Sequence, residues 1–349
     1  MFRSKFKNKI AAAAVLGCLL LTSCSNKPAP SQTQGANAKP DQTAASTEEA
    51  GASESKEAAK AEPDATAQPF DPNEDLSKYD LKDDDPLEQI VSKMEAKYGM
   101  DIVYGKDIRT KFEDENETLI AAVNTNEKDI AIALRSINEG LNSLPKGFIR
   151  QLPYGKHKIL KMYLTGPVTV EGIEGSSVPA FTSDSDDELY LTLEVLDQGV
   201  VNVPTVLHEL THIVDFKLKH DGLLKDEEWA KLNPEGFAYS ESYADNMAGK
   251  KNSENCYCTD HYVPHNTNCA NDDIWFYYSY SKVNAYEDRA TALEDLIIYK
   301  MWNYEVAPDL YKSPHMKAKA EYFLKLVEKD FKMTDSDKEA WQKAFKAIS

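Results

Sequence analysis

The chain has 349 residues, with 58 acidic and 40 basic side chains and a formal net charge of −18 at pH 7. This acidic balance argues against a nucleic-acid-binding protein and against electrostatic adhesion to anionic lipid. Roughly 265 residues follow a polar N-terminal segment, which is enough for one large domain or two small ones.

The first residues have the character of an export signal. A basic region opens the chain, with its charges on Arg3, Lys5, Lys7 and Lys9. The apolar run "IAAAAVLGCLLL" that follows is too short to cross a bilayer comfortably. It ends in "LTSC" (21–24), which resembles the lipobox of bacterial lipoproteins. The resemblance implies removal of residues 1–23 and lipidation, such as palmitoylation, of Cys24. The alternative is an ordinary secretory signal with an incidental cysteine.

Residues 24–82 differ in composition from the rest of the chain. They are rich in Ala, Ser, Thr, Pro, Gln and charged residues, and the first aromatic residue after Cys24 is Phe70. Such a segment buries too little apolar surface to offset its ordering entropy. We therefore expect a disordered tether that holds a folded domain, residues 83–349, at the extracellular side of the cell membrane.

Two helices are expected at the start of this domain. In "DPLEQIVSKMEAKYGMDIVYG" (85–105), apolar residues recur at helical spacing up to Gly99, and a short strand follows. A second helix is expected in "NEKDIAIALRSINEGLNSLP" (126–145), ended by Pro145. The apolar stripes of the two helices consist of Ile90, Met94 and Tyr98, and of Ile130, Leu134, Ile137 and Leu141.

Strands and then further helices follow. "HKILKMYLTGPVTVEG" (157–172) and "DELYLTLEVL" (187–196) are rich in β-branched and aromatic residues and predict strands. Helical patterns cover 203–218, 285–302 and 314–346. This order predicts an α+β domain with a small mixed sheet and a mostly helical C-terminal part.

The helix "VPTVLHELTHIVDFKL" (203–218) contains an H-E-x-x-H motif. Residues four apart lie on one helical face, so His208 and His212 can bind the same metal ion. Glu209 points about 100° away and can reach a water on that ion as a general base. Asp215 shares the face of His212 and can accept a hydrogen bond from a ligand histidine. The alternative is a core helix with two partnered histidines. Because only seven histidines occur in the chain, an H-E-x-x-H motif is improbable by chance, which favours the metal site.

A zinc ion held by two histidines needs a third protein ligand and an open position for water. Three downstream stretches offer candidates. They are "ESYAD" (Glu241–Asp245), the cluster "CYCTDHYVPHNTNC" (256–269), and "YSYSKVNAYEDRA" (278–290) with Tyr280, Asn284 and Glu287.

The pair "HELTHIVD" and "YSKVNAYED" resembles the gluzincin group of zincin metallopeptidases. It is most similar to the catalytic domain of anthrax lethal factor and to related metallopeptidase lipoproteins of Gram-positive bacteria. The resemblance implies one catalytic zinc ion on His208, His212 and Glu287, with Glu209 as general base. It also implies that Tyr280 stabilises the oxyanion and that a sheet edge, here expected in "DELYLTLEV" (187–195), binds the substrate.

Two features depart from the gluzincin pattern. The gap from His212 to Glu287 is longer, and Thr291 replaces an acidic residue four positions after the third ligand. Glu287 also has a second interpretation, because Asn284 and Glu287 have the spacing of a helix capping box. Glu241 remains the alternative third ligand.

The long gap holds an insertion (250–273) with Cys256, Cys258 and Cys269. Extracellular cysteines usually pair, so one disulfide and one free thiol are expected. A second metal ion on these cysteines with His261 and His265 is the less favoured alternative.

Together these features predict a membrane-tethered extracellular zinc metallopeptidase, a hydrolase that acts on peptides or proteins. We expect a monomer that does not bind nucleic acid. One alternative is a zinc amide hydrolase that acts on peptidoglycan in the cell envelope. Another is a non-catalytic binding lipoprotein whose metal ion is structural.

Overall fold

The computed structural model describes residues 71, 74–113, 118–185, 188–239, 274–277, 279–302 and 312–348. The expected signal peptide, the expected lipidation site at Cys24 and most of the expected tether lie outside these residues. The alternative ligand Glu241 and the cysteine insertion (250–273) also lie outside them.

The main sheet has four strands in the order β1-β4-β7-β6. These are β1 (Met100–Tyr104), β4 (Leu160–Thr165), β7 (Leu189–Glu194) and β6 (Ala180–Asp184). β1, β4 and β7 are parallel, and β6 pairs antiparallel with β7. The expected mixed sheet is therefore confirmed, and the pattern of helices around it confirms the α+β class.

Both faces of this sheet are covered, because successive side chains of a strand point to opposite faces. On one face the aliphatic side chains of β4 and β7 pack into the main core with the helices. On the other, Tyr163 and Tyr190 pack with Phe112 and Phe181 in an aromatic cluster. A second sheet, ordered β2-β3-β5, contributes to that cluster. Its strands are β2 (Lys111–Glu113), β3 (Thr118–Ala121) and β5 (Val168–Val170).

The two N-terminal helices are α2 (Leu87–Tyr98) and α3 (Glu127–Leu141). Gly99 ends α2 in the left-handed conformation, and the Asn126 side chain caps α3. The predicted apolar stripes of both helices are buried, as expected. However, α3 ends at Leu141, four residues before the expected stop at Pro145.

Part of the segment assigned to the tether packs on the domain. Leu76 is buried, and a short 3-10 helix, η1 (Ser77–Tyr79), follows it. Arg150 forms an ion pair with Glu74 at 2.6 Å, and Arg135 donates to the carbonyl oxygen of Lys82 at 2.7 Å.

The remaining α-helices are α4 (Val203–His220), α5 (Asp226–Ala230), α7 (Ala285–Trp302), α8 (Pro314–Asp330) and α9 (Asp335–Ile348). Other 3-10 turns are η2 (Gly105–Asp107), η3 (Ile149–Gln151), η4 (Asp197–Gly199) and η6 (Ser279–Lys282). The single helical pattern expected over 314–346 is wrong, because the chain breaks between α8 and α9. Thr334 accepts a hydrogen bond from the Asp337 N–H there and starts a new helix.

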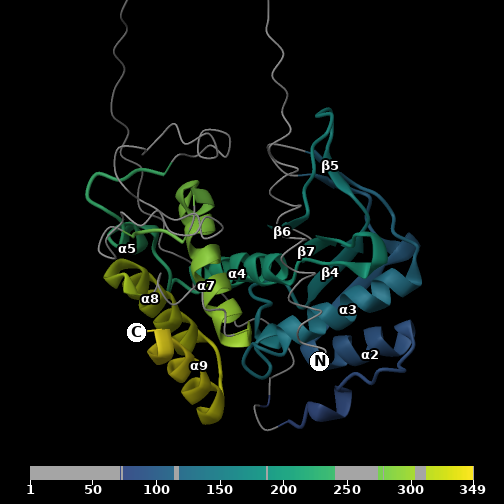
Figure 1. The fold of residues 1–349 in the computed structure, drawn as a ribbon, viewed down its shortest axis with the longest axis horizontal. Coiled ribbons are helices and arrows are strands. Elements are labelled where there is room, and N and C mark those ends of the chain that lie inside the picture. The colour runs from purple at the N-terminus through teal and green to yellow at the C-terminus, as the bar shows by residue number, and fades with distance from the viewer. Residues whose placement is uncertain are drawn as a thin grey trace, which may run out of the picture. The chain divides into compact units, whose positions relative to one another are not determined.

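Helix α4 lies between the sheet and the C-terminal helices (Figure 1). It packs against β6 on one side and against α7 on the other. This central position brings the H-E-x-x-H motif beside both a sheet edge and a second helix. Within the described part of the chain, every helix falls short of the length and apolarity needed to cross a membrane.

Candidate metal centre

The two motif histidines lie in the middle of α4 and point the same way. The apolar side chains Leu207, Leu210 and Val214 bury the helix, which leaves one polar face. On that face the rings of His208 and His212 lie 4.8 Å apart, edge to face. Their Nε2 atoms are therefore available to one ion, as the four-residue spacing predicts.

Glu287 enters the same site from the first turn of α7. The Asn284 side chain accepts a hydrogen bond from the Glu287 N–H at 2.9 Å, which confirms the capping role of Asn284. The Glu287 carboxylate contacts the histidines: its Oε2 lies 2.9 Å from His208 Nε2 and 3.5 Å from His212 Nε2. Asn284 therefore caps the helix as expected, and the Glu287 carboxylate contacts the histidines, as expected of a third ligand.

His208, His212 and Glu287 form a group that can hold a metal ion. One ligand atom from each lies within 4.8 Å of the other two, and His208 and Glu287 are buried. Ligands at 2.0–2.1 Å from a tetrahedral ion are about 3.3 Å apart, close to the two spacings above. Two imidazoles and a carboxylate suit zinc and several other divalent ions.

The electrostatics of the group also favour a cation. Burial disfavours the charge on His208, but its hydrogen bonds to Glu287 and Glu294 outweigh burial and raise its pKa well above the ordinary value. Burial likewise opposes the charge on Glu287, yet the hydrogen bonds to His208 and His212 lower the pKa of Glu287. The Glu287 carboxylate thus stays ionised, and positive charge is stabilised on His208.

Glu294 is a site residue that the sequence did not predict. Its Oε2 lies 3.0 Å from Nδ1 of His208, on the opposite side of the ring from Glu287. A carboxylate that accepts the Nδ1 proton fixes the tautomer in which Nε2 is free to bind a metal. Glu294 follows Glu287 by two helical turns on α7, and that spacing is the signal that could have identified it. Thr291, four residues after Glu287, instead contacts Ser281 at 2.7 Å.

The other two expected catalytic residues lie beside this group. Glu209 is buried on α4, and Thr182 of β6 donates a hydrogen bond to its Oε2 at 2.6 Å. The Tyr280 ring, in η6, lies 5.9 Å from the His208 ring between centroids. The structure therefore brings together four of the residues expected at the site, His208, His212, Tyr280 and Glu287. Glu209 follows His208 on α4, and its carboxylate contacts Thr182.

The expected role of Asp215 beside a ligand histidine is wrong. Its Oδ2 accepts a hydrogen bond from Arg289 at 2.8 Å, and both side chains are almost completely buried. Asp288, which precedes Arg289 on α7, pairs with the buried Lys319 at 2.8 Å. Trp229 also donates to Asp288, at 2.9 Å. These ion pairs join the start of α7 to α4 and α8, and thereby fix the backbone that directly follows Glu287.

The expected edge strand is also wrong, because "DELYLTLEV" forms β7, which pairs with β4 on one side and β6 on the other. The strand beside the site is β6. Its register is set by two bonds, from Glu194 N–H to the Pro179 oxygen and from Ser185 N–H to the Glu188 oxygen. Since bonded and non-bonded pairs alternate, the backbone groups of residues 180, 182 and 184 face away from β7. Among the described residues, none of these groups has a backbone partner.

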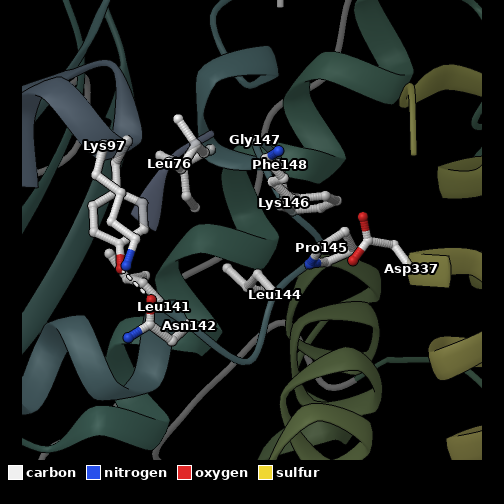
Figure 2. A pocket seen from close by; sticks show the side chains of 12 residues that line it. Leu76, Lys97, Leu141, Asn142, Leu144, Pro145, Lys146, Gly147, Phe148 and Asp337 are labelled. Carbon is white, nitrogen blue, oxygen red and sulfur yellow. Dashed lines mark hydrogen bonds between the residues drawn. The ribbon is translucent and has the colours of Figure 1, made fainter. Parts of the chain in front are cut away.

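A separate cavity of about 230 Å³ lies where α2 and α3 end, near the start of α9. Figure 2 shows Lys97, Asn142, Pro145 and Asp337 around it. Lys97 is paired with Asp80 at 2.7 Å, and Asn142 with the Tyr98 hydroxyl at 3.0 Å. None of the metal-group residues lines this cavity.

Comparisons of the chain with protein-family models, with curated proteins and with solved structures find no match. The candidate function therefore depends on the geometry of the site and on the sequence motifs alone.

Proposed function

We propose that the protein is a zinc-dependent peptidase, tethered by lipid on Cys24 and facing the extracellular side of the cell membrane. The observation that carries this proposal is the convergence of His208, His212 and Glu287, together with Glu209, a further carboxylate next to His208 in the chain that contacts Thr182. A structural zinc site needs no such carboxylate, whereas hydrolysis requires a base. A bound zinc ion would lower the pKa of a coordinated water and polarise the scissile carbonyl.

Each remaining residue has a role in this reaction. Glu209 accepts the proton of the attacking water and then donates it to the leaving amine. The Tyr280 hydroxyl donates a hydrogen bond to the carbonyl oxygen as negative charge develops on it. Glu294 holds the Nδ1 proton of His208, so that Nε2 is presented to the ion.

The substrate would lie in extended form along the free edge of β6. The outward backbone groups of Ala180, Thr182 and Asp184 can pair with a peptide strand, and main-chain pairing gives affinity with little sequence preference. The contact between Thr182 and Glu209 puts this edge next to the general base.

The test is hydrolysis of fluorescein-labelled casein by the zinc-loaded mature chain, compared with Glu209→Gln. We expect Glu209→Gln to keep its zinc and to lose at least about 100-fold in kcat, the usual contribution of a general base. Glu139→Gln, on the exposed face of α3, is the matched control and should keep full activity. Peptidoglycan peptides assayed in parallel test the envelope-hydrolase alternative. Equal activity of Glu209→Gln and wild type would refute the mechanism.

A further inference from the structure

We propose that Thr182 is a positioning residue for Glu209, through which a peptide docked on the edge of β6 orients the general base. The inference rests on the proposed peptidase function and adds a residue that neither the motif nor the resemblance assigns. The Thr182 hydroxyl lies 2.6 Å from Glu209 Oε2 and 3.2 Å from the main-chain oxygen of Glu209. The hydroxyl has one proton to donate. Its contact with the Glu209 carboxylate is shorter than its contact with the Glu209 main-chain oxygen and is the stronger of the two.

The hydroxyl fixes one oxygen of the carboxylate. A glutamate has three side-chain torsions, and a base that leaves the productive geometry by about 1 Å can cost on the order of 100-fold in rate. Glu209 is buried on α4 and Thr182 is half-buried on β6, so their bond is shielded from competing water. With Oε2 held by Thr182, Oε1 remains to accept the proton.

The backbone of the same residue faces the substrate. By the β6 register, the N–H and C=O of Thr182 point away from β7, while its side chain points to α4. Threonine is β-branched, so its χ1 is restricted and the backbone largely sets the direction of the hydroxyl. A strand paired with Thr182 fixes that backbone. Thr182 would thus bind the substrate through its backbone and orient Glu209 through its side chain.

The experiment compares Thr182→Val, which keeps the shape and removes the hydroxyl, with Thr182→Ser, which keeps the hydroxyl. Both are made in the full mature chain loaded with zinc, and casein hydrolysis and bound zinc are measured. We expect Thr182→Val to lower kcat about 10–100-fold with little change in KM or zinc content. Thr182→Ser should stay within about 3-fold of wild type. Unchanged kcat in Thr182→Val, or an equal loss in Thr182→Ser, would overturn the inference and leave the peptidase function standing.

A second measurement does not depend on activity. Urea unfolding of Thr182→Val, Glu209→Ala and the double variant forms a cycle that reads the contact between the two residues. We expect the midpoint shift of the double variant to be smaller than the sum of the single shifts. Additive shifts would overturn the positioning role, whether or not the chain hydrolyses casein. Absence of casein hydrolysis in the wild type, with coupled shifts, would instead refute the peptidase function and keep the Thr182–Glu209 contact.

Discussion

Two groups of buried charged side chains lie at the contact between α4 and α7, and Lys319 of α8 joins the first of them. In the first, Asp215 faces Arg289, and the adjacent Asp288 faces Lys319. In the second, Glu287 and Glu294 contact the two ring nitrogens of His208. Arginine is always charged and lysine ordinarily titrates far above neutral pH, whereas histidine titrates close to neutral pH. The first group is thus neutralised by the protein itself, and the second by a proton or by a metal ion.

Removal of a ligand should have the largest effect on the second group. Glu287→Ala deletes the carboxylate and leaves the α7 cap intact, because Asn284 bonds the backbone N–H of residue 287. We expect zinc, measured by elemental analysis of the purified chain, to fall from one equivalent to nearly none. Glu241→Ala, the alternative ligand of the sequence, is the matched control and should keep its zinc. The reverse pattern would show that the metal group has been assigned to the wrong carboxylate.

The first group should respond to mutation through stability. Arg289→Met leaves Asp215 buried without its cation, and such a loss typically costs about 3–5 kcal/mol of unfolding free energy. Urea denaturation measures the change. Replacement of both partners in Asp215→Leu/Arg289→Met should recover most of that loss, because an apolar pair needs no charge balance. If the double variant recovers stability but loses zinc, the pair serves the metal group and the contrast between the two groups fails.

The residues of the site differ in whether they could be predicted from the sequence, according to whether they act within one helix or between two. His208, Glu209 and His212 are local to one helix, so helical periodicity alone places them together. Glu294 and Arg289 act between helices. The seven-residue spacing puts Glu294 on the same face of α7 as Glu287, but the partners of both residues depend on how α4 and α7 cross, which spacing along one helix does not determine. The same holds for β6: strand order is fixed by long-range pairing, so local pattern does not distinguish the central strand β7 from the edge strand β6. The break between α8 and α9 did have a local signal, the Thr334 cap.

A variant of Glu294 tests whether a residue that is not a ligand contributes to zinc binding by the second group. Glu294→Ala removes the acceptor of the Nδ1 proton and should weaken zinc affinity by about 10–100-fold, as for other groups that orient metal ligands. Competition with a chelator measures the affinity. Thr291→Val is the control for damage to α7, because the Thr291 hydroxyl contacts Ser281 and the backbone oxygens of Glu287 and Asp288. An equal effect of the two variants would mean general damage to α7.

The pH dependence of zinc binding follows from the same contacts. Because Glu287 and Glu294 raise the pKa of His208 above its ordinary value, its protonated form persists to higher pH than in a free imidazole. Zinc needs the unprotonated Nε2, so apparent affinity should be constant above that pKa and fall as pH drops through it. Glu294→Gln removes one negative charge, lowers the pKa of His208 and moves the break in affinity to lower pH. An unmoved break would assign the proton competition to another ligand.

The smallest expected effect tests the edge of β6, where binding depends on backbone groups. Ala180→Pro removes an N–H that faces away from β7, so the sheet keeps all its ladder bonds. Loss of one substrate hydrogen bond, about 1 kcal/mol, should raise the KM for casein by roughly 5-fold with little change in the urea midpoint. Ser183→Pro is the matched control, since its N–H faces Tyr190 of β7 and its loss should lower the midpoint instead. If both variants change the urea midpoint and neither changes the KM for casein, peptides bind elsewhere on the protein. A substrate would then not contact Thr182, and it could not orient Glu209 through that residue.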